Sequence, residues 1–227
     1  MSTPPWRHLG FLTPDAYESQ QDVWALHALV RDHLADTLAS LASQTAEPTW
    51  GASLEQAARS ARELRDALLA ETGDHAPIRV GDDELVREFG SAVAEVTASG
   101  HVPSLIVTGF CVLGELGTLP LRLLQDVAGP YARVLCGRVV GSDEHRLLGR
   151  LFGIVHPSDR ELDALRRLTR HLNGRLADVY RAWRQTFHSL GVDAEWMLDE
   201  ARETVRKSHH ELGLPFSPAD ARTFAHG

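Results

Sequence analysis

The sequence predicts an all-α protein, and three observations support this fold class. Apolar residues recur at helical spacing through most of the 227 residues, from about residue 14 to residue 213. Helix start signals precede many of these runs, such as an Asp or Ser followed closely by Pro or Glu. No series of alternating strands is present, and no heptad repeat is long enough for a coiled coil. The simplest architecture is an antiparallel four-helix bundle with additional C-terminal helices.

The first half of the chain is predicted to hold three helices and one apolar helical segment. Pro14 and Asp15 form a start signal, because Pro is tolerated in the first turn of a helix. Ser53 opens the second helix, and Asp82 or Asp83 caps the third. These elements are expected at residues 14–43, 53–72, 83–99 and 102–121, with a loop at 72–81 that holds a short extended piece at 78–80.

The second half is predicted to hold three longer helices. Gly129 and Pro130 start one continuous helix that stops at His156. Ser158 and Glu161 form a capping box, from which a long helix runs to about residue 190, and a last helix ends near residue 213. The chain is therefore divided into an N-terminal tail, a bundle core, a packed C-terminal extension and a C-terminal tail, at residues 1–13, 14–156, 157–213 and 214–227.

Composition limits the class of protein and its partners. The net charge of −8 comes with no basic stripe, which argues against nucleic acid as a partner. The first residues lack a charged region followed by an apolar run, so we expect no signal peptide and a cytoplasmic protein. Cys111 and Cys136 lie in apolar helical sequence and are interpreted as reduced core residues. The expected partner is a small-molecule substrate, and a homodimer is left open.

Glu115 is the most informative single residue. It is the only charged side chain in the apolar segment 102–121, and burying an unpaired carboxylate costs several kcal/mol. Metal ligation or acid/base chemistry would explain it, and so would an ion pair with an Arg such as Arg122. The segment reaches transmembrane length, but its three glycines, two prolines and Glu115 favour a buried core helix over a membrane span.

Acidic residues on the predicted helices have a spacing that suits facing positions on antiparallel hairpins. Glu144 follows Glu115 by 29 residues (144 − 115), and Glu63 follows Asp32 by 31 (63 − 32). If half of each interval lies on the first helix of a hairpin and half on the second, the two acids of a pair can lie at the same depth in the bundle. Two such hairpins side by side would gather four carboxylates in one interior layer, which needs cations or protons between them.

With these acids, the chain resembles the ferritin-like di-iron carboxylate superfamily. The stretch AARSARELRDALLAE, around Glu63, is similar to the second-helix motif of that superfamily. The stretch VVGSDEHRLLGRLF, around Glu144, is similar to its fourth-helix motif. The resemblance covers about residues 22–155, and it implies two helix pairs that each give one acid on the first helix and Glu-x-x-His on the second.

The ligand set departs from this pattern. The superfamily has a His three residues after the acid on the second helix of each pair. Three residues after Glu63 and Glu144, this chain has Asp66 and Leu147 instead. Asp66 could ligate a hard metal such as iron or manganese, whereas Leu147 cannot ligate anything. His145 points about 100 degrees away from Glu144 around the helix, and a π-bulge or kink would be needed to bring it inward. His33 is a further spare ligand.

The resemblance implies an enzyme that uses iron and dioxygen to oxidise a small organic substrate, with a tailoring step in secondary metabolism as one role. Iron is expected as one or two ions, with manganese, or no retained metal, as alternatives. Glu115 and Glu144 are the candidate catalytic residues. The candidate metal ligands are Asp32, Glu63, Asp66, Glu115, Glu144 and His145.

Two other functions stay open. In the first, a metal-free bundle binds a small apolar ligand or performs non-redox chemistry, with Glu115 or Glu144 as a desolvated general acid or base. Arg133 and Arg138 flank the apolar part of the predicted 130–156 helix and could then neutralise buried carboxylates. In the second, the protein is a non-enzymatic dimerisation module, and the segment 102–121 is buried between subunits.

Overall fold

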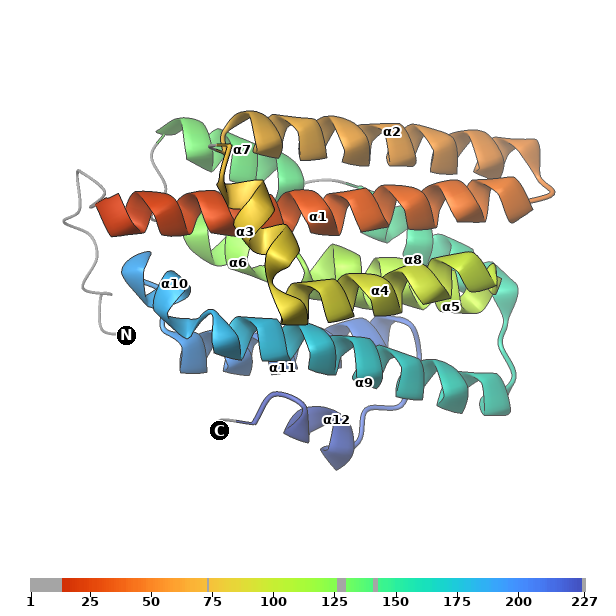
Figure 1. Cartoon of the computed structure of the whole chain (residues 1–227). Helices are drawn as coiled ribbons and strands as arrows, with labels where there is room; N and C mark the ends of the chain where they lie inside the picture. The colour runs from red at the N-terminus through yellow and green to blue at the C-terminus, as the bar shows by residue number, and fades with distance from the viewer. Residues whose placement is uncertain (1–13, 73, 126–129, 141–142, 226–227) are drawn as a thin grey trace.

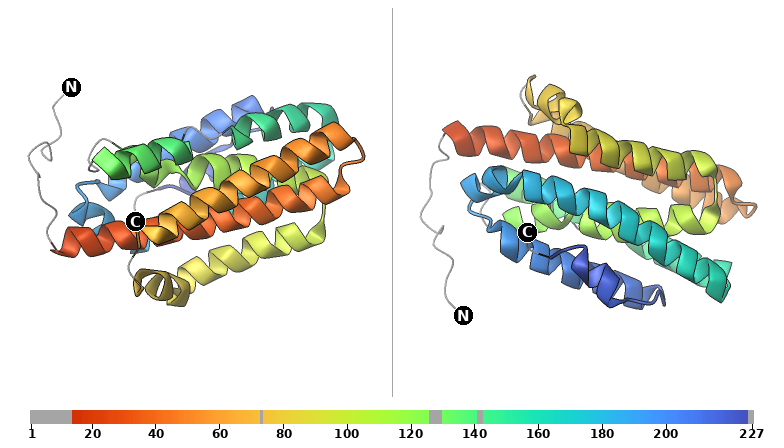
Figure 2. Two further views of the ribbon diagram at one scale, coloured as in Figure 1. Left: turned by 90° about the horizontal axis from the view of Figure 1, so that it is seen from above. Right: turned by 60° about the horizontal axis from the view of Figure 1, so that its bottom comes forward.

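The computed structural model describes residues 14–72, 74–125, 130–140 and 143–225, and every regular element within these ranges is a helix (Figure 1). This result confirms the all-α fold class. Seen from above, α4 (Glu84–Ser99) lies on one side of the pair formed by α1 (Pro14–Gln44) and α2 (Pro48–Ala70). The helices α7 (Pro130–Val140) and α8 (Glu144–Val155) lie on the other side (Figure 2).

α1 (Pro14–Gln44) and α2 (Pro48–Ala70) form the antiparallel hairpin that the sequence predicts (Figure 1). α2 begins earlier than predicted, because Pro48 lies in its first turn and supplies a backbone already suited to a helix. The buried residues of α2 recur every three or four positions, so one apolar face packs on α1. These residues are Leu54, Ala58, Ala61, Leu64 and Leu68.

The expected extended piece at 78–80 is wrong. The structure has a short helix there, α3 (Ala76–Asp82), with Pro77 in its first turn. The predicted cap of the next helix is confirmed, because the Asp83 side chain accepts a hydrogen bond of 3.1 Å from the Val86 backbone N–H at the start of α4.

The apolar segment forms a central helix in three parts, which are α5 (Val102–Val107), the π-helix η1 (Thr108–Leu116) and α6 (Leu119–Leu124). Its length and composition would allow a membrane span, but 78% of its apolar window is buried inside this chain. The helices packed around η1 include α1, α8, α9 (Asp159–Ala182) and α11 (Ala194–Glu211). The central helix is therefore covered within a single chain, and the idea that a second subunit buries it loses its basis.

The predicted continuous helix at 130–156 is wrong, because the structure divides it into α7 (Pro130–Val140) and α8 (Glu144–Val155). Two neighbouring helix ends result, the C-terminus of α7 and the N-terminus of α8. Unpaired backbone carbonyls give the first end a partial negative charge, and unpaired N–H groups give the second a partial positive charge. The candidate site uses both ends.

The C-terminal extension packs against the central helix through its two longer helices, while the short helix between them contacts α1. It contains α9 (Asp159–Ala182), α10 (Arg184–Ser189) and α11 (Ala194–Glu211), so the long helix predicted to reach residue 190 ends earlier, near Trp183. The short helix α12 (Pro218–Arg222) lies at the edge of the molecule, within the predicted C-terminal tail (Figure 2). The buried Asp220 side chain fixes it there by accepting a hydrogen bond of 2.6 Å from Arg170 of α9.

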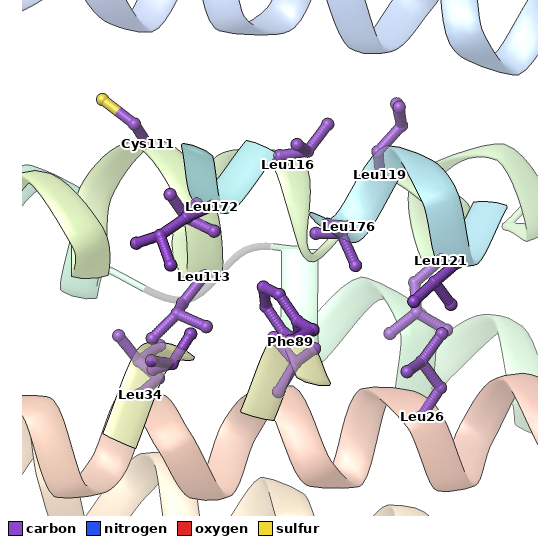
Figure 3. Close-up of a cluster of buried hydrophobic side chains, with 14 of the residues drawn as sticks. Leu26, Leu34, Phe89, Cys111, Leu113, Leu116, Leu119, Leu121, Leu172 and Leu176 are labelled. Atoms are coloured by element: carbon purple, nitrogen blue, oxygen red, sulfur yellow. The ribbon is translucent and has the colours of Figure 1, made fainter. Parts of the chain in front are cut away.

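The core lies between α1, α4, the central helix and α9. In this cluster, Phe89 of α4 lies among leucines of α1, the central helix and α9 (Figure 3). The central helix approaches α1 closely because Gly117 has no side chain, and a Cβ at this position would lie 2.7 Å from Val30 Cγ1. This close packing sets the depth at which the neighbouring residue Glu115 meets α1 and α8.

Candidate functional site

A small pocket of about 80 Å³ lies between α1, the central helix, α7 and α8, and we call it the polar pocket. Among the described residues, two arginines, two glutamates and one histidine dominate its wall, although the central helix that supplies two of them is strongly apolar. The lining residues are Arg31, Leu34, Gly114, Glu115, Thr118, Arg122, Val140, Glu144 and His145.

Arg31 and Glu144 form a buried ion pair in the wall of the pocket. The distance from Arg31 Nη1 to Glu144 Oε1 is 3.4 Å, and the two side chains are only 2% and 6% exposed. Arg31 Nη2 also donates a hydrogen bond of 2.7 Å to the Val139 carbonyl, at the C-terminal end of α7. Burial lowers the pKa of Arg31, and the neighbouring Glu144 opposes that effect.

The break between α7 and α8 stabilises this ion pair from both sides. Arg31 lies at the negative end of α7, whose last carbonyls have no partners within the helix. Glu144 lies in the first turn of α8, where the helix dipole favours a carboxylate. Each helix end therefore stabilises the charge beside it, which offsets part of the cost of burying the pair.

Glu115 and Arg122 form a second, more open pair. Arg122 Nη1 lies 3.5 Å from Glu115 Oε2, and the two side chains are 32% and 26% exposed. Arg122 Nη2 donates to the Glu115 carbonyl at 3.1 Å and to Thr204 Oγ1 at 3.3 Å. The buried Nε–H of Arg122 has no hydrogen-bond partner among the described residues. The prediction that Glu115 could meet Arg122 is confirmed by this contact.

The π-helix helps to place Glu115. A hydrogen bond of 2.6 Å runs from the Gly117 N–H to the Val112 carbonyl, five residues earlier, which is the spacing of a π-turn. Such turns shift the side chains around the helix and are frequent at functional sites. The predicted need for a π-bulge was assigned to the helix of His145, whereas the structure has the π-turns in the segment of Glu115.

Two histidines lie in or beside the polar pocket. His145, the second residue of α8, lines the pocket and packs the edge of its ring against Phe110, with ring centroids 6.4 Å apart. His27 lies one turn before Arg31 on α1, and burial together with the nearby Arg31 lowers its pKa to about 3. His27 is therefore neutral and adds no positive charge to the region near physiological pH.

The structure does not gather the six predicted metal ligands. Glu115, Glu144 and His145 line the polar pocket, but Asp32, Glu63 and Asp66 lie outside it. Asp32 and Asp66 both pair with Arg65 on the surface of the α1–α2 hairpin, and Glu63 is exposed. The predicted interior layer of four carboxylates is therefore absent, because α1 and α2 turn these acids toward solvent and bury apolar residues instead.

The side chains of the pocket do not fit a di-iron centre. No three His, Cys, Asp or Glu side chains in the described part of the chain are grouped so that they could hold a metal ion. A guanidinium group pairs with each described carboxylate of the pocket, and a metal ion would meet two positive charges there. The spare ligand His33 lies elsewhere, packed edge-on against Phe89 of α4.

Arg31 is the residue that sequence reasoning missed. It occupies the buried face of α1, one turn after His27 and one turn before Leu34, where the sequence alone suggested that Asp32 would point inward. The arginines expected to neutralise buried acids, Arg133 and Arg138, are exposed on α7. The missed signal is a charged residue in phase with the apolar positions of its helix, which marks a buried charge.

The arrangement allows proton transfer and the recognition of a charged or dipolar molecule. Glu115 is a half-buried carboxylate beside a small cavity, and the guanidinium group of Arg122 lies 3.5 Å from it. The Arg31–Glu144 pair is deeper and held by a third contact, so it forms a rigid part of the wall.

The fold is similar to that of several solved structures, which include "Protein 19 with aldehyde deformylating oxidase activity from Synechococcus". The TM-score is 0.70 at 14% sequence identity, over 93% of this chain and 96% of that chain. This likeness confirms the predicted all-helical bundle, and at such identity it shows the fold alone. No protein-family model matches the sequence, and no curated protein matches it either.

Proposed function

We propose that this protein is a ferritin-like bundle that acts without a metal ion and binds a small polar molecule in the polar pocket. The Arg31–Glu144 ion pair carries this proposal. It is buried, it joins α1 to α8, and it puts a permanent positive charge beside a carboxylate that would otherwise be a candidate metal ligand. A guanidinium group cannot be exchanged for a metal ion without leaving a buried positive charge unpaired, which is costly.

Within this proposal the two ion pairs have different tasks. Arg31 and Glu144 keep the wall of the pocket in place, because they are almost fully buried and tied to the Val139 carbonyl. Glu115 and Arg122 meet the bound molecule, because they are partly exposed and their contact is long. Glu115 is the group that would accept or donate a proton, which makes non-redox acid/base chemistry the proposed reaction class.

A thermal-shift experiment in the presence of EDTA tests this proposal. The protein is melted with small carboxylates, amines, amino acids, amides and polyols, each in large excess. A ligand present at one hundred times its Kd stabilises by ~2.7 kcal/mol, which would raise Tm by about 5–10 °C for a chain of this size. At least one class should do so for the wild type and fail for Glu115→Gln.

The matched control is Glu203→Gln, which changes an exposed glutamate on α11 that pairs with Arg206. This variant should respond to the ligand as the wild type does. The proposal is wrong if every class leaves Tm unchanged, or if stabilisation appears only after a metal ion is added.

The second candidate function is iron-dependent oxidation of a small organic substrate, including a tailoring role in secondary metabolism. One observation favours it, since three of the predicted ligands, Glu115, Glu144 and His145, line the same pocket in a fold similar to that of an oxidase. Both guanidinium groups would have to move before these side chains could act as ligands. Stoichiometric retention of iron would support this candidate over the metal-independent one.

A further inference from the structure

We infer that the molecule bound in the polar pocket is a small zwitterion of the amino-acid class, an inference that rests on the proposed function above. Its carboxylate would bind Arg122 and its ammonium group would bind Glu115. The charge balance of the pocket, the looseness of one ion pair and the size of the cavity each point to this class of ligand.

The first argument is the balance of charge. Among the residues that the structure describes, the guanidinium groups of Arg31 and Arg122 and the carboxylates of Glu115 and Glu144 line the pocket, and their formal charges cancel. A ligand with a net charge would leave one charge without a partner in a partly desolvated site. A neutral ligand that carries both signs keeps the balance and can pair with each sign.

The second argument is that one ion pair can open at low cost. Glu115 and Arg122 are about a quarter to a third exposed and lie 3.5 Å apart, and such partly exposed pairs contribute little stability. A zwitterion placed between them replaces one ion pair with two. The Arg31–Glu144 pair is buried and tied to Val139, so it stays closed and fixes the depth of the pocket.

The third argument concerns the unused donor of Arg122. Its two terminal nitrogens already contact Glu115 and Thr204, but its buried Nε–H has no partner among the described residues. A buried donor without an acceptor costs about 1–3 kcal/mol, so a ligand that supplies an acceptor once the Glu115–Arg122 pair has opened would gain affinity. A carboxylate suits an arginine best, because its two oxygens match two donors of the guanidinium group.

The size of the pocket limits the ligand further. A cavity needs about 10–15 Å³ to hold one water-sized group, so roughly 80 Å³ accepts between five and eight such groups. Amino acids from glycine to threonine lie in this range. His145 lines both this pocket and a larger groove beyond it, where Phe110, Leu147 and Leu212 are found. His145 therefore separates the polar pocket from the space that a larger side chain would need.

Isothermal titration calorimetry on the full-length protein in EDTA tests the inference. Glycine, alanine and serine are compared with acetate, which carries the carboxylate alone, and with ethylamine, which carries the ammonium group alone. At least one amino acid should bind at least about tenfold more tightly than either half molecule, because each half leaves one charge of the opened pair without a partner.

Two variants at the opened pair sharpen the test. Glu115→Gln gives the pocket a net positive charge, so the affinity for the amino acid should fall. The ratio of the affinity for acetate to the affinity for the amino acid should therefore rise. Arg122→Gln should weaken binding of the amino acid and of acetate together. The control Arg206→Gln changes an exposed arginine that pairs with Glu203, and it should leave both affinities unchanged. Circular dichroism and Tm identify a variant that has not folded.

The outcomes separate the inference from the proposed function. Acetate or ethylamine binding as tightly as the amino acids would overturn the zwitterion assignment and leave a ligand-binding pocket in place. The same holds if amides or polyols bind while amino acids do not. If no small polar molecule binds, the zwitterion assignment and the proposed function are both wrong. Unchanged binding in both Glu115→Gln and Arg122→Gln would place the ligand outside the polar pocket.

Discussion

Arg31 and Glu144 are separated by 113 residues in the sequence and form an ion pair of 3.4 Å that is almost completely buried. The break between α7 and α8 makes this pair favourable, because it provides the C-terminus of one helix beside the arginine and the N-terminus of the other beside the glutamate. In this bundle, whose fold is similar to that of an oxidase from Synechococcus, two side chains of opposite charge therefore lie in the interior.

Replacing Arg31 tests how strongly this pair stabilises the fold. Arg31→Met leaves Glu144 buried without its partner, which is expected to lower the free energy of unfolding by about 3–5 kcal/mol. Arg62→Met is the matched control, since Arg62 forms an exposed pair with Asp36 on the α1–α2 hairpin and its loss should cost less than about 1 kcal/mol. Urea unfolding followed by circular dichroism measures both. Equal losses in the two variants would contradict the role of the buried pair.

The close approach of the central helix to α1 predicts opposite effects at two glycines. Gly117→Ala would place a Cβ 2.7 Å from Val30 Cγ1 and 2.8 Å from the Leu113 carbonyl, so we expect a loss of about 1–3 kcal/mol. At Gly153 in α8, an added Cβ meets nothing within 4 Å, and Gly153→Ala should stabilise by up to about 1 kcal/mol through helix propensity. Thermal unfolding of the two variants under identical conditions checks the signs. A stabilising Gly117→Ala would mean that the two helices are not in close contact.

The buried His27 predicts a dependence of stability on pH. Its pKa is about 3 in the folded protein because of burial and the nearby Arg31, and its ordinary value is 6.5. Because the pKa is lower in the folded protein, the unfolded chain takes up a proton first as the pH falls. The contribution of His27 to the free energy of unfolding is therefore complete above pH 6.5 and is lost as the pH falls toward 3. In His27→Gln, the slope of the unfolding free energy against pH should be smaller between these values, by an amount that corresponds to the uptake of at most one proton. Parallel plots for the two proteins would show that His27 is not buried as described.

The C-terminal helix α12 depends on Asp220. This carboxylate is buried, and it accepts hydrogen bonds from Arg170 and from the Ser217 backbone N–H and hydroxyl. Asp220→Asn removes the charge from these contacts, and we expect a local loss of about 1.5–3 kcal/mol. Hydrogen exchange followed by mass spectrometry should then show faster exchange in residues 214–225 and unchanged exchange in α1. Unaltered protection of α12 would show that other contacts hold it.

Helix existence could be predicted from the sequence more reliably than helix phase. The caps at Asp83 and Ser158, the hairpin of α1 and α2 and the buried central helix were all correctly predicted, because each depends on local signals or on a long apolar run. Asp32 was predicted to face inward, whereas its neighbour Arg31 does so. One residue corresponds to about 100 degrees around a helix. An error of one residue in helix phase was therefore enough to place the surface acid Asp32 in the interior, where the structure has the cation Arg31.

The break between α7 and α8 was not predicted, because helical sequence on both sides outweighed the local signal of Gly141, Ser142 and Asp143, residue types that commonly end one helix and cap the next. Its effect is nevertheless decisive for the site, since it provides the two helix ends that stabilise Arg31 and Glu144. Resemblance to the superfamily gave the correct bundle and pointed to Glu115 and Glu144, but it implied a metal centre. Two residues argue against such a centre. Arg31 comes from α1 and meets Glu144 only in the folded protein, whereas Arg122 follows Glu115 in the central helix and could be named from the sequence as its partner.

Metal content is the measurement that tests the central claim most directly. The wild-type protein is loaded with Fe(II) without oxygen, desalted and analysed by plasma mass spectrometry, with Glu115→Gln prepared in parallel. If the two arginines neutralise the pocket, iron should be far below one ion per chain in both proteins, and adding Fe(II) should not raise Tm. One or two iron ions per chain in the wild type, lost in Glu115→Gln, would contradict the account and establish a metal centre at the polar pocket.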